Sequence, residues 1–277
     1  MEWKKLKNLI ILILLMVNGF LLVLVGARRE GAVRYERAAL EQTVRVLEKN
    51  GIEVDLSAVT DGVGLSAMTV ERDLEREAGL VGALLSEEVQ GENRGGGLYL
   101  YRGVLGEVSV RAGGELSVEF AKDKHWESGL PEQHAASLLK KLGVEAEQTG
   151  VTEEDGRTAV RFRQRWNGAA VFSCEVELVY REGRLETLQG TLLMAEGGTA
   201  EAGQVLSLPT ALMRFSEEIA STGDVCSAIR SMEAGYRGTA QSLSGGTRLT
   251  PVWLVSTNTA GYYLDCVTGA LTRVSDQ

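Results

Sequence analysis

The sequence contains only three cysteines and two histidines, and neither residue type forms a pattern associated with metal binding or catalysis. Cys174, Cys226 and Cys266 are odd in number and too widely spaced for a CxxC or zinc-binding arrangement, so no disulfide framework follows. Each occupies a position that suits a small apolar residue, which predicts buried packing thiols; a single bridge is the alternative. His125 and His134 both lie near the start of one predicted helix, where we expect surface or helix-capping roles.

Recognised catalytic and nucleotide-binding motifs are also missing, because no GxSxG, P-loop or HExxH sequence occurs. The stretch Gly62–Ala67 matches GxGxxA, yet no strand and helix of a βαβ unit flank it, which favours a turn. The acidic run Glu153–Asp155 precedes Gly156 in what we interpret as a solvated loop. We therefore expect no catalytic residues, no cofactor, no metal site and no enzymatic activity.

The chain lacks the basic excess that binding to nucleic acid requires. It holds 29 lysines and arginines against 38 aspartates and glutamates, a formal net charge of -9. Because the N-terminal segment is itself basic, the remainder is more acidic still, and it will repel nucleic acid and anionic membrane surfaces. The 44% hydrophobic content is enough for packed cores, and the length predicts two small domains.

The longest apolar stretch without a charged residue runs from Leu9 to Ala27. Its length is close to the roughly 20 residues that a helix needs to cross a bilayer, so it predicts a transmembrane helix. A cleaved signal peptide is the alternative, because Val25–Ala27 offers small residues to a signal peptidase. Lysines before the stretch and arginines after it balance, so charge does not decide the orientation.

Asn18 and Gly19 lie in the middle of this stretch and are the candidate partner-binding residues. An amide without a partner is costly in lipid, and a small neighbour lets another helix approach, so the two residues predict a helix–helix contact. A lone asparagine tolerated in the bilayer is the alternative.

Beyond the membrane stretch, a helix followed by short alternating strands occurs twice, which predicts an α+β fold class. We expect an N-terminal transmembrane helix followed by two tandem modules of helices packed on antiparallel β-sheets. The predicted domains are a cytoplasmic tail at 1–8, the transmembrane helix at 9–27, and extracytoplasmic modules at 28–125 and 126–277. Expected helices lie near 40–49, 80–85, 131–142 and 209–220, and expected strands near 98–102, 106–111, 115–120, 158–166, 171–180, 185–193, 229–236, 250–255 and 262–266.

One hairpin can be predicted in detail, since Val160–Trp166 and Cys174–Leu178 alternate between apolar and charged residues. A two-residue Asn167-Gly168 loop would place charged residues opposite apolar ones. We therefore expect a three-residue loop with Gly168 bulged, which sets Arg161 opposite Glu175 on the exposed face.

Several short stretches resemble one family in order and in kind. They are Met1–Asn8, Asn18, Phe20–Leu22, Phe162–Gln164, Asn167–Gly168, Val171–Phe172, Ala234–Tyr236, Leu249–Trp253, Tyr262–Asp265 and Thr268–Gly269. The opening stretches resemble the start of the YycI family, also called WalI, of Gram-positive bacteria. The closing stretches resemble strands that YycI shares with YycH and with PepSY-like modules.

This resemblance implies a single-pass protein of the cell membrane, with its N-terminus in the cytoplasm and its bulk outside. Its implied partners are a WalK-like sensor histidine kinase, which it restrains, and a YycH-like protein, beside the lipid bilayer. The implied outcome is control of cell-wall homeostasis, and the family brings no catalytic residues. The alternatives are a PepSY-like extracytoplasmic peptide-binding or hydrolase-inhibitory module, and an unrecognised cell-surface enzyme.

Overall fold

The computed structural model describes residues 3–60, 64–86, 88–121, 129–195, 197–201, 203, 205–241 and 246–274. Within the first helix it does not describe the side chains of residues 4–6, 8–10, 12 and 22–34. The helices are α1 (Trp3–Lys49), a short 3-10 turn η1 (Leu56–Ala58), α2 (Leu74–Leu85), α3 (Pro131–Lys141) and α4 (Leu208–Thr222). The strands are β1 (Glu53–Val54), β2 (Met68–Val70), β3 (Glu92–Gly95), β4 (Leu98–Gly103), β5 (Gly106–Val110), β6 (Glu115–Phe120), β7 (Ala146–Glu154), β8 (Arg157–Trp166), β9 (Ala169–Arg181), β10 (Arg184–Thr191), β11 (Thr199–Ala200), β12 (Ala228–Ala240), β13 (Thr247–Thr257), β14 (Gly261–Asp265) and β15 (Leu271–Arg273).

Helices α1, α3 and α4 end where the sequence predicts. Gly51, Gly143 and Gly223 follow α1, α3 and α4, and each has a positive φ, a conformation that favours glycine and stops a helix. Asp73 caps α2 because its carboxylate accepts hydrogen bonds from the backbone N–H groups of Glu75 and Arg76. The mixed α+β class is confirmed.

The described strands form one 15-stranded sheet, in which β9 pairs with β8, β10 and β12. One edge of β9 pairs with β8. Its other edge pairs antiparallel with β10 and, near its start, parallel with β12, where Ala170 lies opposite Gly235. The prediction of antiparallel sheets therefore holds for most strands but not for β1·β12 and β9·β12, which are parallel. The separate sheets that we predicted are joined by the second of these pairings.

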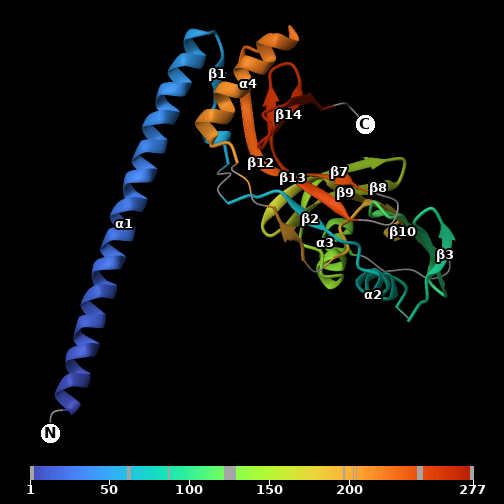
Figure 1. Cartoon of the computed structure of the whole chain (residues 1–277). Helices are drawn as coiled ribbons and strands as arrows, with labels where there is room; N and C mark the ends of the chain where they lie inside the picture. The colour runs from blue at the N-terminus through green and yellow to red at the C-terminus, as the bar shows by residue number, and fades with distance from the viewer. Residues whose placement is uncertain are drawn as a thin grey trace.

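The two largest apolar cores lie along this sheet. In the first core, α2 and α3 pack against strands β4–β6 and β8–β10. In the second core, the end of α1 and helix α4 pack against β12–β14. Figure 1 shows this arrangement, with α2 and α3 at one end of the molecule and α4 near the end of α1 at the other. The chain is thus nested, because the segment before α2 packs with the C-terminal strands. The predicted module boundary at residue 125 lies outside the described residues.

The predicted three-residue hairpin loop is wrong. Arg165 pairs with Ala170 and Trp166 with Ala169, so the loop is the two-residue Asn167-Gly168. Both loop residues have positive φ, at 49° and 80°, which matches the twist of a tight hairpin.

With a two-residue loop and no irregularity, charged residues of β8 would lie opposite apolar residues of β9. A β-bulge corrects this mismatch. The register of β8 against β9 shifts between Arg163 and Arg165, where β9 carries extra residues as it begins to pair with β12. Beyond the bulge, the Arg161 guanidinium lies 3.1 Å from the Glu177 carboxylate, and that of Arg163 lies 2.8 Å from Glu175. The exposed arginine–glutamate ladder therefore exists with a different register.

Candidate functional site

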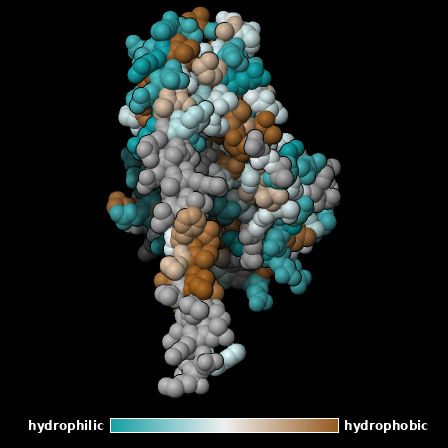
Figure 2. All heavy atoms as spheres, turned by 60° about the vertical axis from the view of Figure 1, so that its left-hand side comes forward, coloured by the Kyte–Doolittle hydropathy of each residue, from teal (hydrophilic) through white to brown (hydrophobic). Residues whose placement is uncertain are grey.

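The N-terminal part of α1 is an exposed apolar helix. Ile13, Leu14, Leu15, Met16 and Val17 are consecutive and 51–68% exposed. Five consecutive helical residues point in all directions around the axis, so the apolar surface surrounds the helix. Figure 2 shows part of it as a brown surface on the stem of the molecule. In Figure 1 this stem extends away from the sheet.

Asn18 and Gly19 lie on this stem and are exposed. No atom of another residue lies within 4 Å of where a Cβ on Gly19 would stand, the helix backbone aside. Among the described residues, no other element therefore lies against Gly19, and the role of Asn18 and Gly19 stays a prediction. Over the positions that the structure describes, none of the helices combines the length and the apolar character that crossing a membrane requires. The transmembrane assignment of Leu9–Ala27 is thus not confirmed.

The other end of α1 is anchored in the second core. Leu47 is fully buried and Thr43 is 8% exposed, while Leu40 packs against the same core from its margin. These three residues recur at the spacing that places them on one face of a helix. α4 contributes Phe215 to the cluster that receives them. The same unbroken helix therefore carries an exposed apolar segment at one end and a fixed contact with the folded domain at the other.

A buried ion pair holds the start of α2 against the β3–β4 hairpin. The Arg72 guanidinium meets the Glu77 carboxylate in two hydrogen bonds, of 2.8 and 2.9 Å, and Glu77 is only 1% exposed. The Tyr101 hydroxyl donates to the same carboxylate at 2.8 Å, and Arg72 also donates to the Gly97 carbonyl at 2.8 Å. Burial, and then the hydrogen bond to Glu77, raises the pKa of Tyr101. The network is satisfied at each charged group and explains why these charges tolerate burial.

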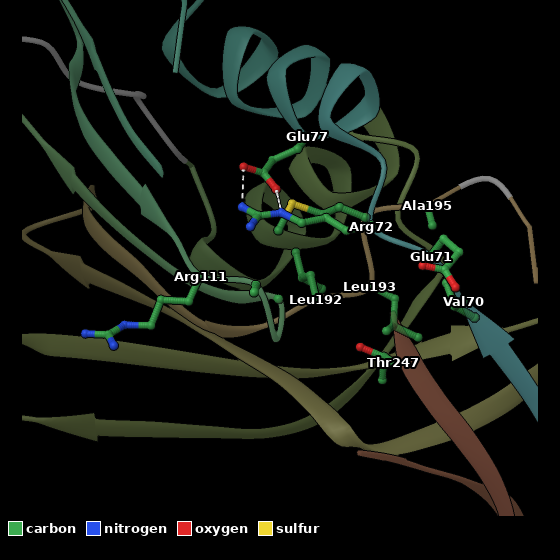
Figure 3. Close-up of a pocket in the computed structure, with 12 residues that line it drawn as sticks. Val70, Glu71, Arg72, Glu77, Arg111, Leu192, Leu193, Ala195 and Thr247 are labelled. Atoms are coloured by element: carbon green, nitrogen blue, oxygen red, sulfur yellow. Dashed lines mark hydrogen bonds and ion pairs between the residues drawn. The ribbon is translucent and has the colours of Figure 1, made fainter. Parts of the chain in front are cut away.

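The cavity beside this pair is too small for a substrate. Its volume is about 30 Å³, enough for one or two water molecules. Figure 3 shows Arg72 and Glu77 facing each other at its wall, while Arg111 points away from them. We interpret the network as structural. The sequence gives no sign of it, because Tyr101 and Gly97 reach the pair only through the fold.

The two histidines and three cysteines do not form a reactive site in the described part of the chain. His125 lies outside the described residues. The Nδ1 atom of His134 lies 2.8 Å from the Tyr180 hydroxyl oxygen, and burial lowers the pKa of His134. Cys174, Cys226 and Cys266 are free thiols. No group of His, Cys, Asp and Glu side chains within the described ranges is arranged to hold a metal ion.

Burial controls the chemistry of two of these thiols. It raises the pKa of Cys174 and of Cys266 to about 12, so both stay protonated and unreactive near neutral pH. Cys226 is only half-buried.

Comparison with known proteins adds little to this description. No family model and no curated protein matches the chain. Among solved structures, the chain is similar to the Bacillus megaterium YpeB C-terminal domain, with 11% sequence identity and a TM-score of 0.37. The alignment covers 75% of this chain and all of that one. This similarity is too low to carry an argument about function.

Proposed function

We propose that the chain is a membrane-anchored extracytoplasmic regulator in which α1 couples the folded domain to the membrane. The observation that carries the proposal is the continuity of α1 from Trp3 to Lys49, with Leu47 buried in the second core. An unbroken helix is a rigid element, so a rotation or displacement of the domain would be passed along it. Such an element can bias a partner that has two states.

The anchoring role of α1 has its own physical support. An apolar surface on all sides of a helix is unfavourable in water and favourable in hydrocarbon. We place the N-terminus in the cytoplasm and the domain outside, following the resemblance to YycI. Carbonate extraction of membranes followed by sequencing of the mature N-terminus tests the anchor. The chain should stay with the membrane and keep Leu9–Ala27, whereas a processed protein that begins at Arg28 would overturn it.

The partners that we propose are a WalK-type sensor histidine kinase and a YycH-like protein. The support is the family resemblance of the opening, middle and closing stretches. The regulator would bind one signalling state of the kinase more tightly than the other and so restrain it, with cell-wall homeostasis as the outcome. This mechanism needs no catalytic group.

The membrane segment offers a direct test of partner contact. Replacing Asn18 by Leu together with Gly19 by Ile removes the polar and small positions, and such interhelical contacts contribute on average about 0.6 and at most ~2 kcal/mol. We expect weaker crosslinking to the kinase and altered kinase output, not complete loss, because the outer domain also contributes. The matched control replaces Ile13 and Phe20, on the opposite side of α1, by Leu. Equal effects of the two double variants would show that the Asn18 face has no special role.

A further inference from the structure

β7 is the longest open edge of the sheet. Among the strands that the structure describes, β7 has nine residues and pairs only with β8. The other strands with one partner are β1, β3, β11 and β15, and none exceeds four residues. A long edge strand leaves a row of backbone N–H and C=O groups available to another strand. β7 therefore provides the backbone half of a strand-addition site.

An apolar groove lies next to the start of this edge. It opens between α3 and β7 and has a volume of about 460 Å³, which is in the range of ligand-binding pockets. Its lining is mainly apolar and comprises Ala136, Leu139, Lys140, Gly143, Val144, Glu145, Ala146 and Phe162. Leu139, Val144 and Phe162 also belong to the first core, so the groove is a place where that core reaches the surface. A strand beside β7 could place an apolar side chain there.

The edge carries an acidic excess. Glu153, Glu154 and Asp155 are exposed, and none has an ion-pair partner among the side chains that the structure describes. Glu147 is also acidic, but its carboxylate lies 2.5 Å from the Arg165 guanidinium. Unpaired like charges along an edge favour a partner of the opposite charge. The partner strand should therefore be basic.

The same charges disfavour a second copy of this chain as the partner. In an antiparallel pairing of two β7 strands centred on Gly150, Glu147 would lie opposite Glu153, and like charges directly opposite each other destabilise a sheet. A bulge at Thr149 further limits regular pairing on β7 to two parts, one at the groove and one over Gly150–Glu154. Ala146 and Glu154 lie about 26 Å apart along an extended strand, so a partner segment of roughly eight to ten residues spans the whole edge.

We propose that β7 and the adjacent groove form a docking site for an extended basic polypeptide segment of another protein. The segment would add to the sheet as a strand beside β7 and insert one apolar side chain into the groove between α3 and β7. This surface is separate from α1, and the proposal does not depend on regulation of a kinase.

A defined peptide probes the site without knowledge of the natural partner. The probe is a peptide of about ten residues in which lysine alternates with valine, a length that matches the edge. One comparison peptide has glutamate in place of lysine, and another carries N-methyl groups on alternate backbone amides, which blocks strand pairing. Fluorescence anisotropy with the whole chain in zwitterionic micelles gives the dissociation constants. We expect the lysine peptide to bind and each comparison peptide to lose about tenfold or more in affinity.

Variants of the chain then separate the groove from general charge attraction. Ala136→Trp fills the groove from an exposed position of α3 and should weaken binding of the lysine peptide about tenfold or more. Ser137→Trp adds the same side chain at the next exposed position, which does not line the groove, and should leave binding unchanged. Glu153→Lys with Glu154→Lys should reverse the preference between the lysine and glutamate peptides.

Three outcomes would overturn the proposal: no binding of the lysine peptide at millimolar concentration, equal binding of the N-methylated peptide, or equal effects of the two tryptophan variants. None of these three binding measurements uses kinase output. Each of these outcomes would therefore overturn the docking site without counting against the proposed regulatory function.

Discussion

The first core and the second core are stabilised by different interactions. The first core borders a buried Arg72–Glu77 pair and contains Tyr180, which contacts His134, so hydrogen bonds of defined geometry fix how its elements sit. The second core is assembled mainly from apolar side chains of α1, α4 and β12–β14, and its Tyr262 hydroxyl donates a hydrogen bond of 2.8 Å to the Asp224 carboxylate. Apolar packing is less directional than hydrogen bonding, so the second core depends on how closely its side chains fit, and the first core also depends on hydrogen-bond geometry. The contact that fixes α1 to the domain therefore depends on apolar packing, whereas the start of α2 is held by polar geometry.

The buried ion pair should give the largest effect on stability. Glu77→Ala leaves the Arg72 guanidinium buried without its partner, and removing one member of a buried pair costs about 3–5 kcal/mol. Urea unfolding with far-UV circular dichroism measures the free energy of unfolding. The control is Arg72→Met combined with Glu77→Leu, which should cost less than Glu77→Ala alone. A double variant that is less stable than Glu77→Ala would contradict the assignment of this core to polar geometry.

Weakening the contact between α1 and the second core should give the next largest effect on stability. Leu47→Ala removes a fully buried side chain from the second core, and substitutions of this kind cost about 2–5 kcal/mol. We expect hydrogen exchange to rise first in α4 and the last turns of α1, with α2 and α3 little changed. Val46→Ala, at a neighbouring position that is 40% exposed, is the matched control. Uniform loss of protection across both cores would show that they do not respond separately.

The junction between the cores should give a smaller loss. A Cβ on Gly235 would stand 2.5 Å from the Ala170 carbonyl oxygen and 2.7 Å from the Phe172 ring, so Gly235→Ala forces β9 and β12 apart. Overpacking of this type costs about 1–3 kcal/mol. Thermal unfolding of Gly79→Ala provides the contrast. Gly79 is helical and unobstructed, so alanine there should stabilise the fold by up to ~1 kcal/mol. A neutral Gly235→Ala would mean that the junction is not tightly packed.

The pH response of the first core should be the smallest effect. Burial lowers the pKa of His134 in the folded state, whereas the unfolded chain keeps the ordinary value of about 6.5. Below that value the unfolded state binds more protons than the folded state, so stability falls as the pH drops from 6.5 toward the lowered folded pKa and is retained above it. His134→Gln should flatten this part of the curve of unfolding free energy against pH. An unchanged curve would assign the dependence to other groups.

The sequence predicts the elements with clear apolar periodicity and misses those without it. Helices α3 and α4 end at the predicted glycines, and β4–β6 lie where alternation places them. The sequence predicts a loop at Glu153–Asp155, but Glu153 and Glu154 lie in β7, whose single large apolar residue is Val151. An edge strand buries little, so it needs no alternating pattern; its pairing with β8 is decided by the fold. The segment that we propose as a docking edge was therefore the hardest to recognise.

Long-range pairing explains the other differences. The Asn167-Gly168 loop follows its local sequence signal. The three-residue alternative fails because the register of β8 against β9 shifts, beside the point where β9 pairs with β12, a strand far away in the chain. The Arg72–Glu77 network likewise depends on Tyr101, which only the sheet brings into reach. Asn18 and Gly19 stay predictions, because their proposed contacts lie outside this chain.

The central claim is that α1 transmits the state of the outer domain as a rigid helix, and insertion of alanines between Glu36 and Arg37 tests it most directly. Both residues are exposed, so the insertion leaves the second core intact. Each added residue rotates the domain by about 100° relative to the stem, while seven return it to within about 20° of the original direction. We predict that kinase output changes strongly with two added alanines and returns toward the original level with seven. An output that is the same for both insertions would contradict the account.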